Sequence, residues 1–118
     1  YITDTNILYR SAQAIISASH IEGLPFNIME ALECGIPAIV SKIKGHKDLI
    51  IDGFNGMLFA DNDQIGLSEK MSEFSNSEIY NKIKKNVFLE SKYEVSEATE
   101  VLLHYYLQLS ETIPTYSV

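Results

Sequence analysis

Two short apolar runs separated by one amphipathic stretch dominate the first half of the chain. Residues 14–18 (AIISA) lack polar alternation and are predicted to be a strand covered on both faces, and residues 38–41 (AIVS) are predicted to be a second strand. Between these runs, Ile28, Ala31 and Leu32 recur at helical spacing. The order strand, helix, strand predicts two parallel strands joined by a right-handed crossover.

Residues at both ends of this central helix indicate where it begins and stops. Asn27 is predicted to be the N-cap, Gly35 follows the last turn, and Pro37 prevents the helix from continuing. A third strand is expected at residues 57–59 (MLF), after two glycine-containing turn signals. The pattern therefore predicts an α/β domain with a parallel sheet.

The second half of the chain is predicted to be helical. Three helices are expected, with N-caps in residues 61–63 (DND), at Ser77 and at Ser96. Their apolar positions are predicted to face the core: these are Ile65, Leu67, Met71, Ile79, Ile83, Val87, Val101, Leu102, Tyr105 and Leu109.

Two carboxylates stand where a ligand crevice is expected. Glu22 lies in the loop after the first strand, and Glu30 lies on the following helix. Open parallel sheets bind ligands outside the carboxyl ends of their strands, where helix N-termini present free N–H groups. In the loop of residues 19–27, Gly23 lets the backbone approach a ligand closely and Pro25 stiffens the chain. A diphosphate or a sugar hydroxyl is predicted to dock there.

Each of these residues also has a simpler interpretation. The spacing from Asn27 to Glu30 fits a capping box, in which Glu30 bonds back to the N-cap amide. Glu22 fits a solvated loop carboxylate. Gly45, which follows the second strand, belongs either to the same ligand edge or to an ordinary turn. The local pattern alone leaves these alternatives open.

Composition narrows the classes of function. The chain has 118 residues and is 46% hydrophobic, which is enough to bury a core, and we expect residues 1–118 to form a single partial domain. A net charge of −7 argues against nonspecific nucleic-acid binding, which needs a basic surface. No apolar stretch approaches the roughly 20 residues of a transmembrane segment. The chain is therefore expected to be cytoplasmic.

The histidines and the cysteine do not predict a metal site. The three histidines lack metal-ligand spacing, so no metal is expected. His20 and His46 fall at the expected ligand edge and are candidates for a hydrogen bond to a sugar, whereas His104 lies in a helical pattern and is expected to be structural. Cys34 has no second cysteine to pair with and is expected to be a small buried thiol.

An ordered series of motifs, taken together, resembles one known family. The pieces are residues 8–14 (LYRSAQA), Ser19, residues 22–25 (EGLP), residues 30–32 (EAL), residues 35–37 (GIP), Gly45 and residues 48–59 (DLIIDGFNGMLF). This series resembles the C-terminal, donor-binding domain of the glycosyltransferases of family 4, which have the GT-B fold. The resemblance implies a Rossmann-like parallel sheet with flanking helices, and an N-terminal acceptor domain that is absent from this chain.

The resemblance also implies a reaction and roles for residues. It implies retaining transfer of a hexosyl group from a nucleotide sugar, UDP- or GDP-linked, without a cofactor or an essential metal. Glu22 is implied as the catalytic-site residue facing the donor sugar, and Glu30 as the acceptor of hydrogen bonds from the ribose hydroxyls. The implied donor-binding residues are Ser19, Glu22, Gly23, Leu24, Pro25, Phe26, Asn27 and Glu30.

The acceptor implied by the resemblance is a glycan or a lipid-linked molecule, bound through the missing N-terminal domain. Such enzymes work at the cytoplasmic face of the membrane, in pathways that build capsular polysaccharide, exopolysaccharide or other surface glycans. Tyr105 and Tyr106, near the end of the chain, are candidates for contact with the missing half.

One departure from the family pattern concerns the phosphates of the donor. The family's phosphate clamp, an Arg and a Lys, belongs to a part of the domain that precedes this chain. The nearest basic residues are Lys42, Lys44 and Lys47, which are either solvated or contribute one ammonium group to a phosphate. Two other functions therefore stay open: a noncatalytic nucleotide-binding or interaction module, and a GT-B-type nucleotide-sugar epimerase.

Overall fold

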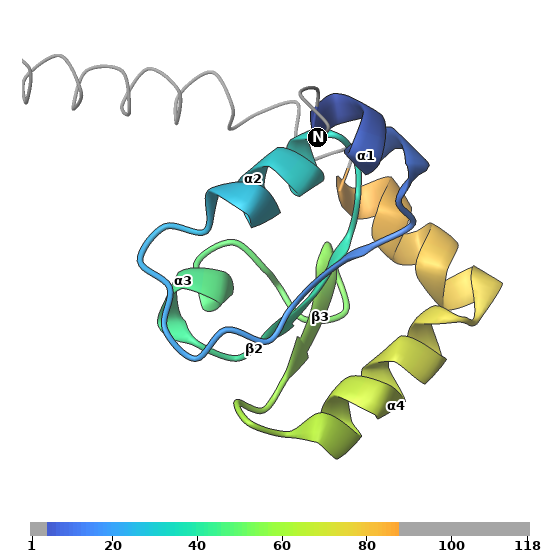
Figure 1. Cartoon of the computed structure of the whole chain (residues 1–118). Coiled ribbons are helices and arrows are strands. Elements are labelled where there is room, and N and C mark those ends of the chain that lie inside the picture. The colour runs from blue at the N-terminus through green and yellow to red at the C-terminus, as the bar shows by residue number, and fades with distance from the viewer. Residues whose placement is uncertain (1–4, 88–118) are drawn as a thin grey trace, which may run out of the picture.

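Three parallel strands form the middle layer of residues 5–87, the part of the chain that this computed structural model describes (Figure 1). The strands are β1 (Ile15–Ser17), β2 (Ala38–Ser41) and β3 (Gly56–Phe59), in the spatial order β1-β2-β3. Both pairs of strands are parallel, and Ile16 of β1 stands opposite Ile39 of β2. The predicted parallel sheet is therefore confirmed.

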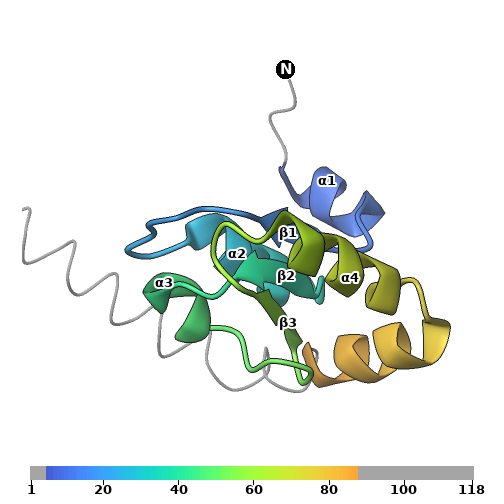
Figure 2. The same ribbon diagram turned by 90° about the horizontal axis from the view of Figure 1, so that it is seen from below.

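Helices cover the two faces of this sheet. They are α1 (Thr5–Ser11), α2 (Phe26–Glu33), α3 (Lys44–Lys47) and α4 (Gln64–Phe74), followed by helical residues 77–87. Figures 1 and 2 show α2 on one side of the sheet, with α4 and residues 77–87 on the other. This arrangement of helix, sheet and helix is the predicted α/β class.

The central strand β2 is buried on both faces. Its Ala38 and Val40 pack with Ile28 of α2, whereas Ile39 packs on the opposite face with Ile83. All four residues of β2 are buried. Alternate side chains of a strand point to opposite faces, so a strand between two helical layers needs apolar residues in succession. The strand predicted at residues 38–41 is therefore confirmed, and both of its faces are covered.

The first strand differs from its prediction. Ile15 packs on the α2 side, but Ile16 is 44% exposed on the other side. β1 is one edge of the sheet formed by the described residues, and α4 lies over β2 and β3, at the other side of the sheet from β1 in strand order. Within this part of the chain, the prediction that both faces of β1 are covered is therefore wrong.

The start of α2 also differs from its prediction. Pro25 occupies the cap position, no side chain caps this end, and Asn27 lies inside the helix. Proline fits at this end because its fixed φ suits the first turn and the N–H that it lacks would have no partner within the helix. The prediction of Asn27 as N-cap is wrong, and the capping-box interpretation of Glu30 is wrong with it.

The end of α2 is formed as predicted. Gly35 has a φ of +74°, a left-handed conformation that glycine adopts without a steric penalty. The N–H groups of Gly35 and Ile36 donate to the carbonyl oxygens of Leu32 and Ala31, at 2.9 and 2.8 Å. This pair of bonds is a Schellman motif, which satisfies carbonyls at the end of the helix.

The two helices after the sheet start at polar caps. The Asp63 side chain accepts a bond from the N–H of Gly66 at 2.9 Å, so the N-cap predicted within residues 61–63 is confirmed. For the next helix, Ser77 is the wrong cap. The Asn76 carbonyl Oδ1 instead accepts bonds from the N–H groups of Glu78 and Ile79, at 2.9 and 3.3 Å.

Core positions of these helices are confirmed only in part. Ile83 and Val87 are buried, and Leu67 and Ile79 pack against the cluster that contains Ile83. Ile65 is 74% exposed and Met71 is 46% exposed, so these two are wrongly predicted as core residues. The remaining predictions lie outside the described residues; they concern Ser96, Val101, Leu102, His104, Tyr105, Tyr106 and Leu109.

Candidate functional site

The candidate site lies where the carboxyl ends of the three strands meet. The Ser41 hydroxyl, at the end of β2, donates to the Ser19 carbonyl oxygen at 2.5 Å. His20 Nδ1, after β1, lies 2.7 Å from Asp61 Oδ1, after β3. The structure thus joins the segments that follow all three strands at one edge of the sheet, which is where the sequence predicts a ligand crevice.

A chain of hydroxyl groups positions the carboxylate of Glu22. Ser17 Oγ donates to Ser19 Oγ at 3.2 Å, and Ser19 Oγ donates to Glu22 Oε1 at 2.8 Å. Glu22 is half-buried. A hydrogen bond to an ionised carboxylate is stronger than one between neutral groups, so Ser19 holds Glu22 in one orientation. The interpretation of Glu22 as a freely solvated loop residue is therefore wrong.

Gly45 touches the backbone beside Glu22. It is buried within α3 rather than exposed in a turn. A Cβ atom at this position would lie 2.5 Å from the Glu22 carbonyl oxygen and 3.2 Å from that of Gly23. Glycine is therefore needed here because α3 and the loop that carries Glu22 pack backbone to backbone.

His46, the next residue of α3, is completely buried. Its Nδ1 lies 2.9 Å from the Ser41 carbonyl oxygen and 3.2 Å from Ser41 Oγ. A carbonyl oxygen only accepts, so Nδ1 donates and the Nε2 of the neutral ring carries a lone pair. Among the described residues, this Nε2 has no hydrogen-bond partner. A bond from His46 to a donor sugar stays a prediction.

His20 joins the site through an exposed hydrogen-bond contact between its Nδ1 and the Asp61 carboxylate. The side chains of His20 and Asp61 are 65% and 43% exposed. Solvent screening makes such a surface pair a weak contribution to stability, so its main effect is to hold two loops together. A contact between His20 and a sugar stays a prediction.

Glu30 projects from α2 toward α1. Its Oε2 accepts a hydrogen bond from the Tyr9 hydroxyl at 2.9 Å. Burial raises the pKa of Tyr9, and the hydrogen bond to Glu30, the charge of Glu30 and the charge of Cys34 raise this pKa further. Sequence reasoning missed Tyr9 as a neighbour of the site, and its only signal was a place in the motif series that contains Glu30.

The segment of residues 21–27, around and after Glu22, exposes apolar side chains. Ile21 is 90% exposed, Leu24 is 46% exposed and Phe26 is 47% exposed, while Pro25 between the last two is buried. Gly23 and Asn27 are exposed as well. The predicted donor-binding segment is therefore accessible along most of its length, and its contact with a donor stays a prediction.

Other candidate residues lie around this edge. Lys42, Lys44 and Lys47 all have exposed side chains. Cys34 is half-buried, so the prediction of a buried thiol is wrong. Among residues 5–87, no group of three His, Cys, Asp or Glu side chains could hold a metal ion. In the same part of the chain, no helix is both long and apolar enough to cross a membrane.

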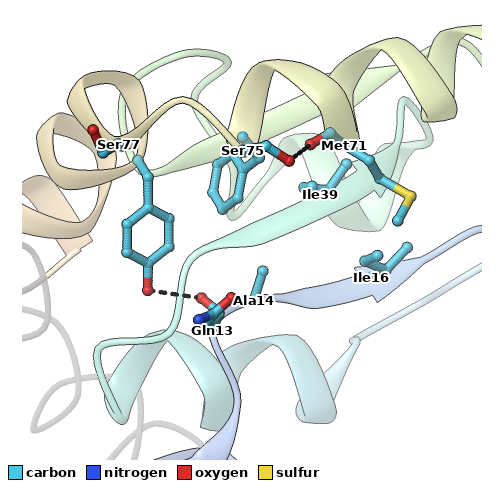
Figure 3. A pocket seen from close by; sticks show the side chains of 9 residues that line it. Gln13, Ala14, Ile16, Ile39, Met71, Ser75 and Ser77 are labelled. Carbon is cyan, nitrogen blue, oxygen red and sulfur yellow. Dashed lines mark hydrogen bonds between the residues drawn. The ribbon is translucent and has the colours of Figure 1, made fainter.

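A pocket of about 330 Å³ lies away from this edge, between the sheet and α4 (Figure 3). Ile16 and Ile39 line it on the sheet side, and Met71 and Phe74 line it on the helix side. The Tyr80 hydroxyl donates to the Gln13 carbonyl oxygen at 3.1 Å on its border. None of the predicted donor-binding residues contributes to this pocket.

The family model described as "Glycosyl transferases group 1" matches residues 1–89. This chain belongs to the group 1 glycosyl transferases. The match includes every predicted site residue, from Ser19 to His46, and the whole described sheet.

Curated relatives of this group 1 glycosyl transferase include two bacterial enzymes. One, from Campylobacter jejuni, is "GalNAc-alpha-(1->4)-GalNAc-alpha-(1->3)-diNAcBac-PP-undecaprenol alpha-1,4-N-acetyl-D-galactosaminyltransferase"; it is 33% identical over 69% of this chain and 23% of its own length. The other, from Escherichia coli, is "UDP-Gal:alpha-D-GlcNAc-diphosphoundecaprenol alpha-1,3-galactosyltransferase"; it is 32% identical over 69% of this chain and 21% of its own length. The chain spans about a fifth of the length of the curated relatives that it matches.

Solved structures share the fold. Sucrose-phosphate synthase from Thermosynechococcus elongatus matches 92% of this group 1 chain and 28% of its own chain, with a TM-score of 0.74 and 20% identity. TarM matches with a TM-score of 0.72. These likenesses confirm the predicted fold, a parallel sheet with flanking helices as in GT-B glycosyltransferases.

Proposed function

We propose that this chain forms the donor-binding half of a retaining hexosyltransferase of glycosyltransferase family 4. The observation that carries the proposal is the joined carboxyl edge of the sheet, with Glu22 held there by Ser19 and Glu30 exposed on the next helix. The donor is a UDP- or GDP-linked sugar, bound without an essential metal. The name of the Escherichia coli relative gives UDP-Gal as its donor, which favours UDP over GDP as the nucleotide of the donor.

The proposed role of Glu30 follows from its charge and exposure. A ribose diol offers two O–H donors, and a carboxylate accepts two hydrogen bonds at once. Hydrogen bonds to a charged group contribute about 1.5–3 kcal/mol each. Glu30 presents an exposed carboxylate on α2, after the loop of residues 19–27. It therefore binds the nucleotide rather than the transferred sugar.

The proposed role of Glu22 is to orient the donor sugar. A glycosidase needs two carboxyl groups that flank the scissile bond, one as acid and one as nucleophile or base. Here the second glutamate is assigned to the ribose, so the type of residue alone gives Glu22 neither glycosidase role. Ser19 fixes the orientation of the Glu22 carboxylate before the donor binds. This lowers the entropic cost of orienting the sugar for transfer.

The proposed acceptor is a lipid-linked glycan at the cytoplasmic face of a membrane. Support comes from the two bacterial relatives, whose names give undecaprenol-linked acceptors. Incubation of the intact enzyme, with its acceptor domain, with UDP-galactose and an undecaprenyl-diphosphate-linked sugar tests transfer, and NMR of the anomeric proton identifies the product. A product with an inverted anomeric centre would exclude the retaining mechanism.

Nucleotide binding is tested by titrating the chain with UDP, GDP and ADP and following amide NMR shifts. We expect shifts in residues 19–30, and Glu30→Gln should weaken binding at least about tenfold because the ribose loses a charged acceptor. Glu33→Gln is the matched control, since it removes the same charge from an exposed position of the same helix. Equal losses in the two variants would mean that net charge, and not the ribose contact, governs binding.

A further inference from the structure

Tyr9 links α1 to the carboxylate assigned to the ribose. Its hydroxyl lies 2.9 Å from Glu30 Oε2 and 3.4 Å from the Asn27 carbonyl oxygen, so it reaches two positions one turn apart on α2. The two oxygens near Tyr9 can only accept, and the phenol O–H is the donor in this cluster. Tyr9 is half-buried whereas Glu30 is exposed, so the anchor of the contact is the tyrosine.

The contact leaves Glu30 able to bind a diol. An ionised carboxylate has two oxygens and about four lone-pair positions. The Tyr9 hydroxyl uses one of these positions on Oε2, which leaves Oε1 and the rest of Oε2 for two further donors. An exposed glutamate otherwise samples many rotamers, and this freedom is lost when a ligand is bound. Holding the side chain beforehand removes part of that loss.

We infer that Tyr9 is a positioning residue, which holds the Glu30 carboxylate in the orientation that receives the ribose diol of the donor nucleotide. The inference rests on the proposed function, since it assigns a residue that acts through Glu30. Tyr9 is not a catalytic residue, because its hydroxyl contacts protein oxygens and acts on the nucleotide only through that carboxylate.

The protonation state of Tyr9 fits this role. Burial raises its pKa above the ordinary value of 10.0, and the bond to Glu30 and the charge of Glu30 raise it further. Tyr9 therefore remains a neutral donor throughout the neutral pH range. Glu30→Gln removes the neighbouring charge, so the pKa of Tyr9 should fall toward 10.0, and a tyrosine titration of the unliganded protein followed by NMR measures this fall.

The binding test compares Tyr9→Phe with the wild type on two ligands. One is the nucleoside diphosphate that binds best among UDP, GDP and ADP, and the other is its 2′,3′-dideoxy analogue. For the ribonucleotide, Tyr9→Phe should raise Kd about three- to tenfold, as expected for one lost hydrogen bond. For the dideoxy analogue, Kd should be unchanged, because no diol is present for Glu30 to receive.

Two further variants separate positioning from a merely structural effect. Tyr80→Phe is the matched control, since it removes a phenol hydroxyl that donates to the Gln13 carbonyl oxygen at 3.1 Å, away from the predicted donor-binding residues. It should leave both Kd values unchanged. In a Glu30→Gln background, Tyr9→Phe should cause no additional loss, because the two residues act as one unit.

Three results would overturn the inference. Equal weakening of the ribonucleotide and the dideoxy analogue by Tyr9→Phe would show that Tyr9 only supports the packing of α1 on α2. Weakening by Glu30→Gln without any change in Tyr9→Phe would leave the proposed function standing and remove the role of Tyr9. Failure of the wild type to bind UDP, GDP and ADP would remove the proposed function and this inference with it.

Discussion

At the scale of single residues, the neighbours of Glu22 decide how the candidate site is held. Ser19 fixes the carboxylate by a hydrogen bond, and Gly45 permits the loop backbone to rest on α3. Neither Ser19 nor Gly45 is a charged residue that would pair with the Glu22 carboxylate. The geometry of the loop therefore depends on one small polar side chain and on one residue without a side chain.

Gly45→Ala should destabilise the protein because its Cβ would collide with backbone that cannot rotate away. The nearest atom is the Glu22 carbonyl oxygen, at 2.5 Å, and overpacking of this kind costs about 1–3 kcal/mol. Urea denaturation followed by circular dichroism measures the free energy of unfolding.

Gly23→Ala provides the control for that measurement. It makes the same substitution in the neighbouring loop, where an added Cβ would meet nothing within 4 Å. Its free energy of unfolding should change by no more than about 0.5 kcal/mol. If Gly45→Ala were as mild, the close backbone contact would not constrain the loop.

Sequence reasoning identified some of these residues and could not identify others. Glu22 and Glu30 could be found because ionisable side chains follow an apolar run at the expected ligand edge. The bond from Tyr9 to Glu30 spans 21 residues along the chain, and periodicity says nothing about such a pair. The sequence places Gly45 at the ligand edge or in a turn, but glycine is needed at this position because a loop distant in sequence packs against it, which no local pattern encodes.

At the scale of the elements, helix ends show how competing signals are resolved. Both Asn27 and Pro25 suit the start of α2, and the structure uses Pro25. The cap side chain of asparagine is only one way to begin a helix, and a fixed φ is another. The end was easier to predict, because Gly35 with a positive φ has few substitutes.

Asp63→Ala should destabilise α4 by about 1 kcal/mol, the usual effect of removing an N-cap side chain. The Asp63 carboxylate accepts the N–H of Gly66 at 2.9 Å, and alanine would leave that donor without its partner. Asp63→Asn keeps an acceptor of similar shape and should retain most of the stability. A loss of equal size in both variants, measured by urea denaturation, would point to charge instead of capping.

At the scale of the whole described unit, burial is uneven across the sheet. β2 lies between two helical layers, whereas β1 is one of the two edge strands of the sheet in residues 5–87 and exposes Ile16. The two apolar runs are nearly alike in composition, so the sequence predicts both strands but does not indicate which of them is more deeply buried. Position in a sheet depends on which strands and helices pack around a run, and β propensity does not contain that information.

Ile16 and Ile39 allow a direct test because they stand opposite one another in the sheet. Ile39→Ala should cost about 2–5 kcal/mol, since this side chain is 2% exposed in the core. Ile16→Ala should cost less than about half as much, since 44% of the side chain is already in water. Urea denaturation compares the two, and similar losses would mean that the Ile16 side of β1 is covered in solution.

The close approach of Gly45 to the Glu22 loop has a consequence for mutational screens. Every other amino acid carries a Cβ, so every missense change of the Gly45 codon places an atom against the Glu22 carbonyl oxygen. A scan that scores only lost function would therefore rank position 45 beside the glutamates, although it has no functional group to offer a substrate. Scoring protein abundance in the same library separates the two kinds of position, because a glutamate exposed like Glu30 can be replaced without lowering the amount of folded protein.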